Sequence, residues 1–291
     1  MRNFIFSLLL FVTILFNSSF AQELEITLSI DKTNYLKYET IKAVAELKNI
    51  SLDDFAITQP FLAESYGSGI EVLLFDSLNN KIPARDQHAL DAYMTRDLEL
   101  KPNESLITLL HLSRWFGEKI PEGNFTGGDY RTLEPGKYKL QSTYEYIAHN
   151  TRQKTNSNIV GFEIIKPTEK DLNIFSDIRN ITSESLGIST EQYLENLSEA
   201  INKYPQSSYV LGVYYGFFQS ADSATTELKE KMLKMIEDYP SSFVTLASLL
   251  NSKNKGKDFM KLAESQLKEK SELNKTMLEK YENYQKIRDR K

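Results

Sequence analysis

Apolar and polar residues alternate along several stretches of the first half of the chain. The pattern is strict at residues 24–30. It recurs at 41–48, where Val44 is the one apolar residue at the intervening positions, and again at 137–146 after Pro135-Gly136. Because successive side chains of a strand point to opposite faces, a period of two is typical of half-buried strands. Shorter apolar runs bounded by turn residues predict further strands near 55–58, 70–75, 106–112 and 159–165. Residues 22–166 are therefore expected to form an antiparallel β-sandwich.

The second half has a different period. Beyond Pro167, apolar residues recur at intervals of three and four, which indicates amphipathic helices. Thr168 with Asp171 and Ser189 with Gln192 have the spacing of helix starts. A long polar helix is expected from about Lys257 to the end of the chain. The sequence thus predicts a two-domain protein, with an all-β part over 22–166 and an all-α part over 167–291 that each fold independently.

A weak repeat runs through the helical part. The segment Tyr204-Pro205 is echoed 35 positions later by Tyr239-Pro240, and Ile201 and Ile236 occupy the same register before these turns. A period of about 34 residues with two helices per unit is the signature of stacked α-hairpins. Each hairpin then leaves an apolar face for its neighbour to cover.

Two families are suggested by these segments. Residues 28–51, together with the segments 133–140 and 157–164, resemble the opening and closing strands of exported bacterial immunoglobulin-like domains. Such domains usually have Pro-Gly in the turn before the second strand. This chain has Leu36-Lys37-Tyr38-Glu39 there, so that turn is atypical. The resemblance implies an accessory module, of which some occur beside peptidases and some are similar to proteinase inhibitors. The helical period resembles tetratricopeptide-type repeats, although the Trp-Leu-Gly consensus is missing.

The first residues have the organisation of an export signal. Met1-Arg2-Asn3 carries one positive charge, residues 4–16 are apolar, and small residues occupy positions 19 and 21. The apolar run is shorter than the ~20 residues that span a bilayer, which makes a membrane anchor the weaker alternative. We expect residues 1–21 to be a signal peptide and the mature chain to be exported, in the periplasm or outside the cell. No later segment is long and apolar enough to span a membrane.

Cleavage of the signal peptide predicts a specific mass for the exported protein. The exported protein should begin at or near Gln22, because Ser19 and Ala21 have the spacing of small residues that signal peptidases accept. Intact-mass spectrometry of the exported form checks this, and retention of residues 1–21 there would contradict the prediction.

The composition excludes several kinds of chemistry. The chain has 291 residues, a formal net charge of −5, three histidines and no cysteine. Without cysteine it has no disulfide framework, no thiolate metal site and no thiol nucleophile. The acidic balance argues against a nucleic-acid partner. His88, His111 and His149 have no carboxylate or nucleophile at the spacing of a known catalytic motif. The sequence also has no hydrolase, phosphate-loop or metal motif. We therefore expect no catalytic residues, no metal and no cofactor.

Two aromatic groups are candidates for protein binding. Arg114 and Trp115 precede a Gly/Pro-rich stretch, and Trp with Arg is the composition of an interface hot spot. Tyr214, Tyr215 and Phe218 lie on an aromatic helix with more than one apolar face, so some of them are candidates for lining a peptide groove. For both groups the alternative is packing within the fold.

The charge is unevenly distributed. From Lys253 onward, 12 basic and 7 acidic residues leave a net charge of +5, against −11 for residues 22–252. This asymmetry marks either an electrostatic contact site or the solvated end of a helical array.

Taken together, these features favour a non-catalytic, exported factor of the bacterial cell envelope that binds a protein or peptide. A peptidase inhibitor or an enzyme of unrecognised type is the alternative. Carboxylates converging with a histidine in a deep pocket would favour the enzyme, and an open groove or exposed aromatic patch would favour the binder.

Overall fold

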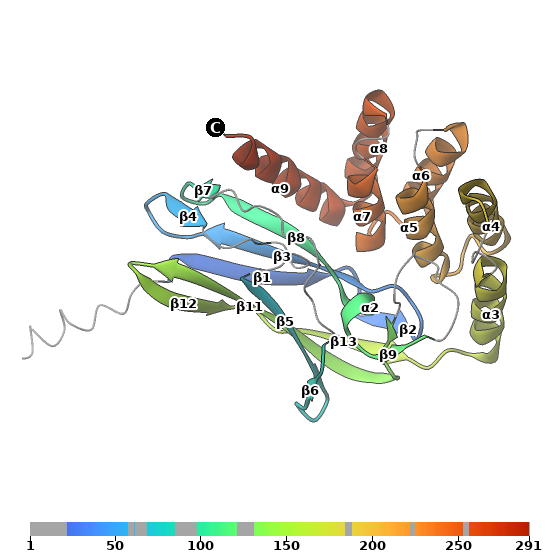
Figure 1. The fold of residues 1–291 in the computed structure, drawn as a ribbon, viewed down its shortest axis with the longest axis horizontal. Coiled ribbons are helices and arrows are strands. Elements are labelled where there is room, and N and C mark those ends of the chain that lie inside the picture. Colours follow the sequence, from blue (N-terminus) through green and yellow to red (C-terminus); the bar gives the residue numbers. More distant parts are fainter. Residues whose placement is uncertain are drawn as a thin grey trace, which may run out of the picture.

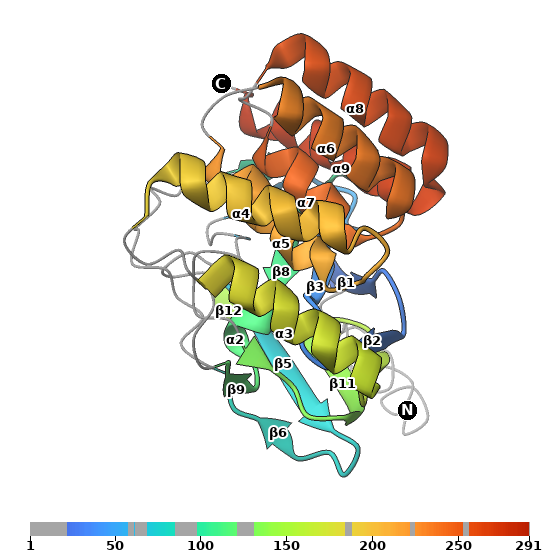
Figure 2. The ribbon, with the colours of Figure 1, turned by 90° about the vertical axis from the view of Figure 1, so that its right-hand side faces the viewer.

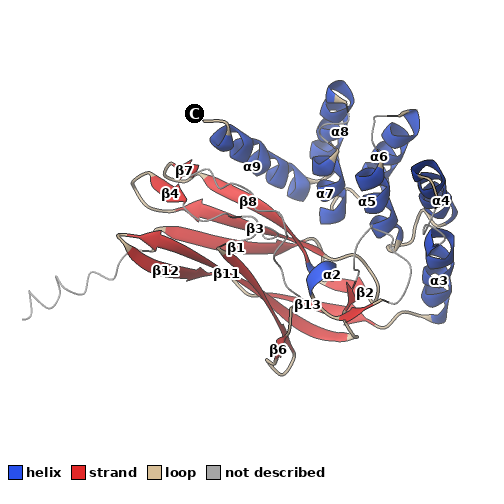
Figure 3. Ribbon diagram, viewed as in Figure 1, coloured by secondary structure: helices blue, strands red, loops and turns tan. Residues whose placement is uncertain are grey.

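The computed structural model describes residues 22–57, 61, 69–84, 98–120, 131–183, 188–221, 225–252 and 256–290. A β-rich part occupies the first half of the chain and a helical part the second (Figures 1 and 3). The two-part layout predicted from the periodicities is therefore present, with the change from strand to helix next to Pro167.

The β-rich part contains two main sheets. The first is antiparallel and has the order β1 (Leu24–Ile30), β3 (Lys42–Asn49), β8 (Ser105–His111). The second has the order β2 (Asn34–Leu36), β13 (Val160–Ile165), β11 (Gly136–Ala148), β5 (Ile70–Asp76), β6 (Lys81–Ile82), and β12 (Thr151–Asn156) pairs with the far half of β11. Smaller elements are the pairs β4 (Phe55–Ile57) with β7 (Leu98–Leu100) and β9 (Glu118–Lys119) with β10 (Arg131–Thr132), and the short helix α2 (Leu112–Trp115).

The two main sheets pack face to face around an apolar core. Ala43, Ala45 and Leu47 of β3 point into it, as do Leu74 of β5 and Leu140 of β11. These are the apolar members of the alternating runs, so the inward faces follow the sequence pattern. The predicted strands near 55–58, 70–75, 106–112 and 159–165 correspond to β4, β5, β8 and β13.

The helical part comprises α3 (Glu169–Ser183), α4 (Thr190–Lys203), α5 (Val210–Ser220), α6 (Thr226–Asp238), α7 (Phe243–Asn251), α8 (Lys257–Lys270) and α9 (Glu272–Arg288). The helices α5, α7 and α9 lie toward the first sheet, and α3, α4, α6 and α8 form the outer layer (Figure 2). At the predicted start points, Ser189 Oγ accepts the Gln192 amide, and Thr168 and Asp171 cap α3 reciprocally.

The single long C-terminal helix expected from the sequence is two helices. Ser271 ends α8, and its Oγ accepts the amide of Asn274 to begin α9. A serine cap offers the backbone a way to leave one helix and start another, which a continuous polar pattern does not reveal.

Two side chains that are 35 residues apart each make hydrogen bonds to the preceding turn between helices. The Tyr239 hydroxyl donates to the carbonyls of Pro205 and Ser207, at 2.7 and 3.0 Å. Thirty-five positions on, Asn274 Nδ2 donates to the carbonyls of Pro240 and Ser242 at the same two distances. Tyr204 and Tyr239 end their helices with nearly equal backbone angles, although the Tyr204 hydroxyl donates to Asp177 instead.

The apolar core of the helical part extends onto the outer face of the first sheet. Val44 of β3 and Ile107 of β8 point away from the sheet core and belong to the same buried cluster as the helices. Asp31 Oδ2 accepts the amide of Phe243 at the start of α7, at 2.9 Å. Gly212 allows α5 to come close, because a Cβ atom there would lie 2.6 Å from Thr40 Oγ1. Lys42, Val44 and Ile107, on the outer face that half-buried strands would expose, are buried.

The basic C-terminal helix also docks on the β-rich part. Lys280 pairs with Glu46 of β3, and Arg290 pairs with Glu104 just before β8. This Arg290 contact lowers the pKa of the Glu104 carboxyl. Ile287 is buried and belongs to the core cluster of the β-rich part. The charge asymmetry of the sequence therefore includes contacts within the molecule.

Candidate functional site

The aromatic residues singled out from the sequence are buried. Trp115 of α2 is 4% exposed and packs in the core of the β-rich part. Tyr214 and Phe218 of α5 are fully buried with their rings stacked at 6.1 Å, and Tyr215 faces the first sheet. Arg114 is half-buried beside Trp115. For the four aromatic residues, burial favours the packing alternative over direct contact with a partner.

Tyr215 is the centre of a buried polar cluster between sheet and helices. The Lys42 ammonium lies 3.9 Å from the centre of its ring, a cation–π contact, and Lys42 itself is 3% exposed. The His111 ring lies 5.4 Å away, and Asn251 Nδ2 of α7 donates to the Tyr215 hydroxyl at 3.2 Å. We call Lys42, His111, Tyr215 and Asn251 the Tyr215 cluster. It holds β3, β8, α5 and α7 together.

The outer helical layer carries an open groove between α4 and α6, with a volume of about 580 Å³. Its lining is polar and charged, and we call it the α4–α6 groove: Glu195, Ser198, Glu199, Asn202, Lys203 and Glu227. The α4 members Glu195, Ser198, Glu199 and Asn202 follow helical spacing, so a single face of that helix supplies them.

Two polar bridges join α4 to α6 beside the groove. Ser198 Oγ donates to Glu227 Oε1 at 2.5 Å, and Lys231 Nζ donates to Asn202 Oδ1 at 2.9 Å. Both pairs step along their helices by four residues, which keeps them on the facing sides. Burial lowers the pKa of Lys231, partly offset by Glu227 and Glu230. These bridges set the spacing of the two helices.

The groove is predominantly acidic. Glu195 and Glu199 are exposed, and the Glu227 carboxylate is held toward α4 by Ser198. Lys203, which also lines the groove, pairs with Asp177 of α3 at 2.6 Å, so its positive charge is offset by that carboxylate. Sequence reasoning missed this site because the carboxylates meet only when α4 pairs with α6. The spacing of Glu195 and Glu199 on one helical face was the signal available.

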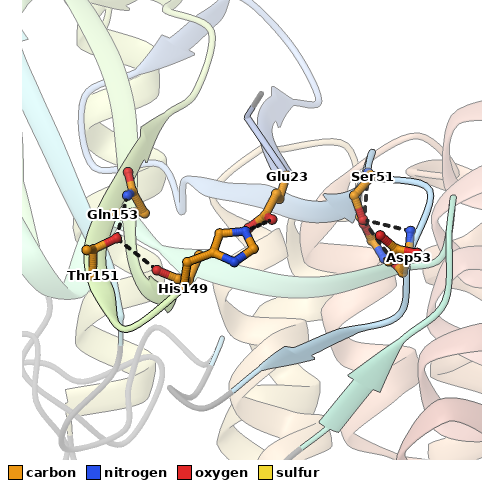
Figure 4. A network of polar contacts seen from close by, with 8 residues as sticks. Glu23, Ser51, Asp53, His149, Thr151 and Gln153 are labelled. Carbon is orange, nitrogen blue, oxygen red and sulfur yellow. Dashed lines mark hydrogen bonds and ion pairs between the residues drawn. The ribbon is translucent and has the colours of Figure 1, made fainter. Parts of the chain in front are cut away.

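A second group of polar contacts lies near the far end of the sheets, around the start of β1 (Figure 4). His149 Nε2 lies 2.8 Å from Glu23 Oε1, and Thr151 Oγ1 donates to the Ala148 carbonyl. Ser51 Oγ donates to the Asp53 carbonyl in the neighbouring turn. These contacts close a hairpin and a turn, which gives them a structural role.

Clustered metal-ligating side chains do not occur within the part of the chain that the structure describes: no three His, Asp or Glu residues converge there. His88 lies outside the described residues. No described helix combines the length and apolar character needed to cross a membrane.

No family model matches this chain, and no curated protein matches it. Among solved structures it is similar to Spo0M, a sporulation control protein from Bacillus subtilis, at 10% identity and a TM-score of 0.27, over 55% of this chain and 56% of that one. A β-glucosidase, EmGH1, from Erythrobacter marinus shows 11% identity and a TM-score of 0.21 over 46% of this chain and 15% of the enzyme. At these TM-scores neither similarity bears on fold or function.

Proposed function

We propose that this chain is a non-catalytic, exported accessory factor of the bacterial cell envelope that binds a protein or peptide segment carrying basic side chains. The α4–α6 groove is the proposed binding site. The observation that carries the proposal is the groove itself, which is open to solvent and lined with carboxylates.

The layering of the helices supports this site. The inner helices α5, α7 and α9 are occupied by contacts with the first sheet, so the outer layer is the helical surface left for a partner. An extended cationic segment complements Glu195, Glu199 and Glu227 in charge. Such complementarity contributes to recognition and to the rate of encounter.

We also propose that the two parts are an immunoglobulin-like sandwich and a tetratricopeptide-like array. The face-to-face packing of the main sheets supports the first assignment. The bonds from Tyr239 and Asn274 to turns 35 residues apart support the second. Both architectures serve as scaffolds for interaction rather than as catalysts in their own right, and the site decides the function.

Peptide binding by purified protein tests the proposal. Isothermal titration with extended Lys/Ala peptides should show binding that weakens as salt rises, because screening reduces attraction between exposed charges. The double variant Glu195→Gln/Glu199→Gln should lower the affinity about fivefold to thirtyfold, which corresponds to about 1–2 kcal/mol.

The matched control is Glu269→Gln/Glu279→Gln, which makes the same change of charge at exposed positions of α8 and α9. It should bind like the wild type. Equal binding of a Glu/Ala peptide, or equal losses in both double variants, would remove the case for the groove as a cation-selective site.

A further inference from the structure

His111 is buried without a hydrogen-bond partner. It ends β8, is 2% exposed, and neither ring nitrogen meets a donor or acceptor among the described residues. Buried polar groups are nearly always paired, so an unpaired imidazole between two packed layers calls for an explanation. Its ring faces Tyr215 of α5, across the contact between the sheet and the helices.

Among the described residues, the charged groups that act on His111 disfavour protonation of its ring. Lys42 of β3 and Arg114 of α2 act on the imidazole, and both are cations. Tyr215 faces it from α5, and Asn251 of α7 approaches the Tyr215 hydroxyl without carrying a charge. Burial holds the pKa of His111 well below its usual value, and Lys42 and Arg114 act in the same direction.

We propose that the contact between the first sheet and the helical layer is acid-sensitive, with His111 as its sensor. We call the packed state of sheet and helices closed. In this state a protonated His111 would have two N–H groups without acceptors, and its positive charge would lie beside that of Lys42. The proton is therefore bound only when the layers separate enough to let water reach His111. Acidification shifts the population toward this opened arrangement, because the proton binds one state better than the other.

The direction of the pH dependence follows from linkage. The unfolded or opened chain binds the proton near pH 6.5, whereas the closed state binds it only at lower pH. Between these two values the open state holds more protons, so stability rises with pH and falls on acidification. Within this window, each pH unit favours opening by up to a factor of about ten.

Trp115 is a built-in reporter, because it is the single tryptophan and lies in α2, directly after His111. Acrylamide quenching of its fluorescence and urea unfolding should be measured on the full mature chain from pH 7.5 to pH 5. In the wild type, quenching should increase and the urea midpoint fall as the pH drops. In His111→Phe, which keeps a ring and removes the titration, the part of this pH dependence due to His111 should disappear.

His149→Gln is the matched control, because His149 is an exposed histidine at the far end of the sheets. It should retain the wild-type pH dependence. An unchanged pH dependence in His111→Phe would overturn the proposal. If that variant does not fold, NMR titration of the three histidines in the wild type decides: a His111 signal that titrates near pH 6.5 in the closed protein contradicts the proposal, and one that stays neutral until the layers open supports it.

Discussion

Ile201→Ala and Ile236→Ala should each lower the free energy of unfolding by about 2–5 kcal/mol. Both side chains are completely buried, one in α4 and one in α6. Removing them leaves cavities at the positions related by the 35-residue interval, so the two losses should be similar. Urea unfolding followed by ellipticity at 222 nm measures them.

Two exposed positions of the same helices provide the control. Glu199→Ala and Lys234→Ala, also 35 residues apart, should change stability by no more than about 0.5 kcal/mol. Lys234 makes an ion pair with the half-buried Asp238 four residues on, at 3.1 Å, and pairs at this helical spacing contribute only about 0.3–0.5 kcal/mol. A silent Ile236→Ala would mean that the two hairpins are not equivalent, and the array would lose its main energetic support.

Ile107→Asp should destabilise both parts of the molecule together, by about 3–5 kcal/mol. Ile107 is buried among the helices although it belongs to β8, and it lies directly opposite Glu46 on β3. The new carboxylate would be buried next to a like charge. Urea transitions followed by ellipticity at 222 nm and by Trp115 fluorescence should shift to lower urea by the same amount, because side chains of β3 and β8 belong to the core of the helical part.

The matched control is Ile165→Asp, the same substitution in β13 at a side chain that is 42% exposed. It should leave both transitions close to those of the wild type. If Ile107→Asp instead moved only the fluorescence transition, the helical part would be folding independently, as the sequence alone predicts.

The inward faces of the strands could be predicted because a local pattern determines them. In β3, Ala43, Ala45 and Leu47 alternate with Lys42, Val44, Glu46 and Lys48, and the period of two gives their direction without knowledge of the rest of the fold. The helix starts at Ser189 and Thr168 were visible for a similar reason, since a cap is a contact between residues three positions apart.

The cover over the first sheet could not be predicted, because its partners are far apart in the chain. Lys42 resembles a solvated lysine in an alternating strand, yet it is buried under Tyr215, 173 positions further on. Tyr38 is similar: it adopts a φ of 77°, a conformation that normally favours glycine, and its ring stacks on Phe175 of α3 at 4.3 Å. The atypical turn is thus compensated by a contact with the helical part.

The binding role of the aromatic residues stays a prediction, and their burial could not be foreseen for a related reason. Aromatic residues such as Tyr214 and Phe218 suggested a binding surface by composition, but the inner helices need them for packing between layers. The groove instead consists of common surface residues, Glu195 and Glu199, whose significance depends on the neighbour that faces them.

The burial of Ile287 of α9 in the core cluster of the β-rich part has a consequence for how this protein can evolve. Open helical arrays gain or lose whole units by duplication or deletion, because each unit contacts only its neighbours. Here the last helix, α9, packs against the β-rich part, so the hairpins between α3 and α9 must cover a fixed distance. An added hairpin would move α9 beyond its contacts with the strands, and a deleted hairpin would prevent α9 from reaching them. Homologous chains should therefore differ in the lengths of their turns while keeping the same number of hairpins.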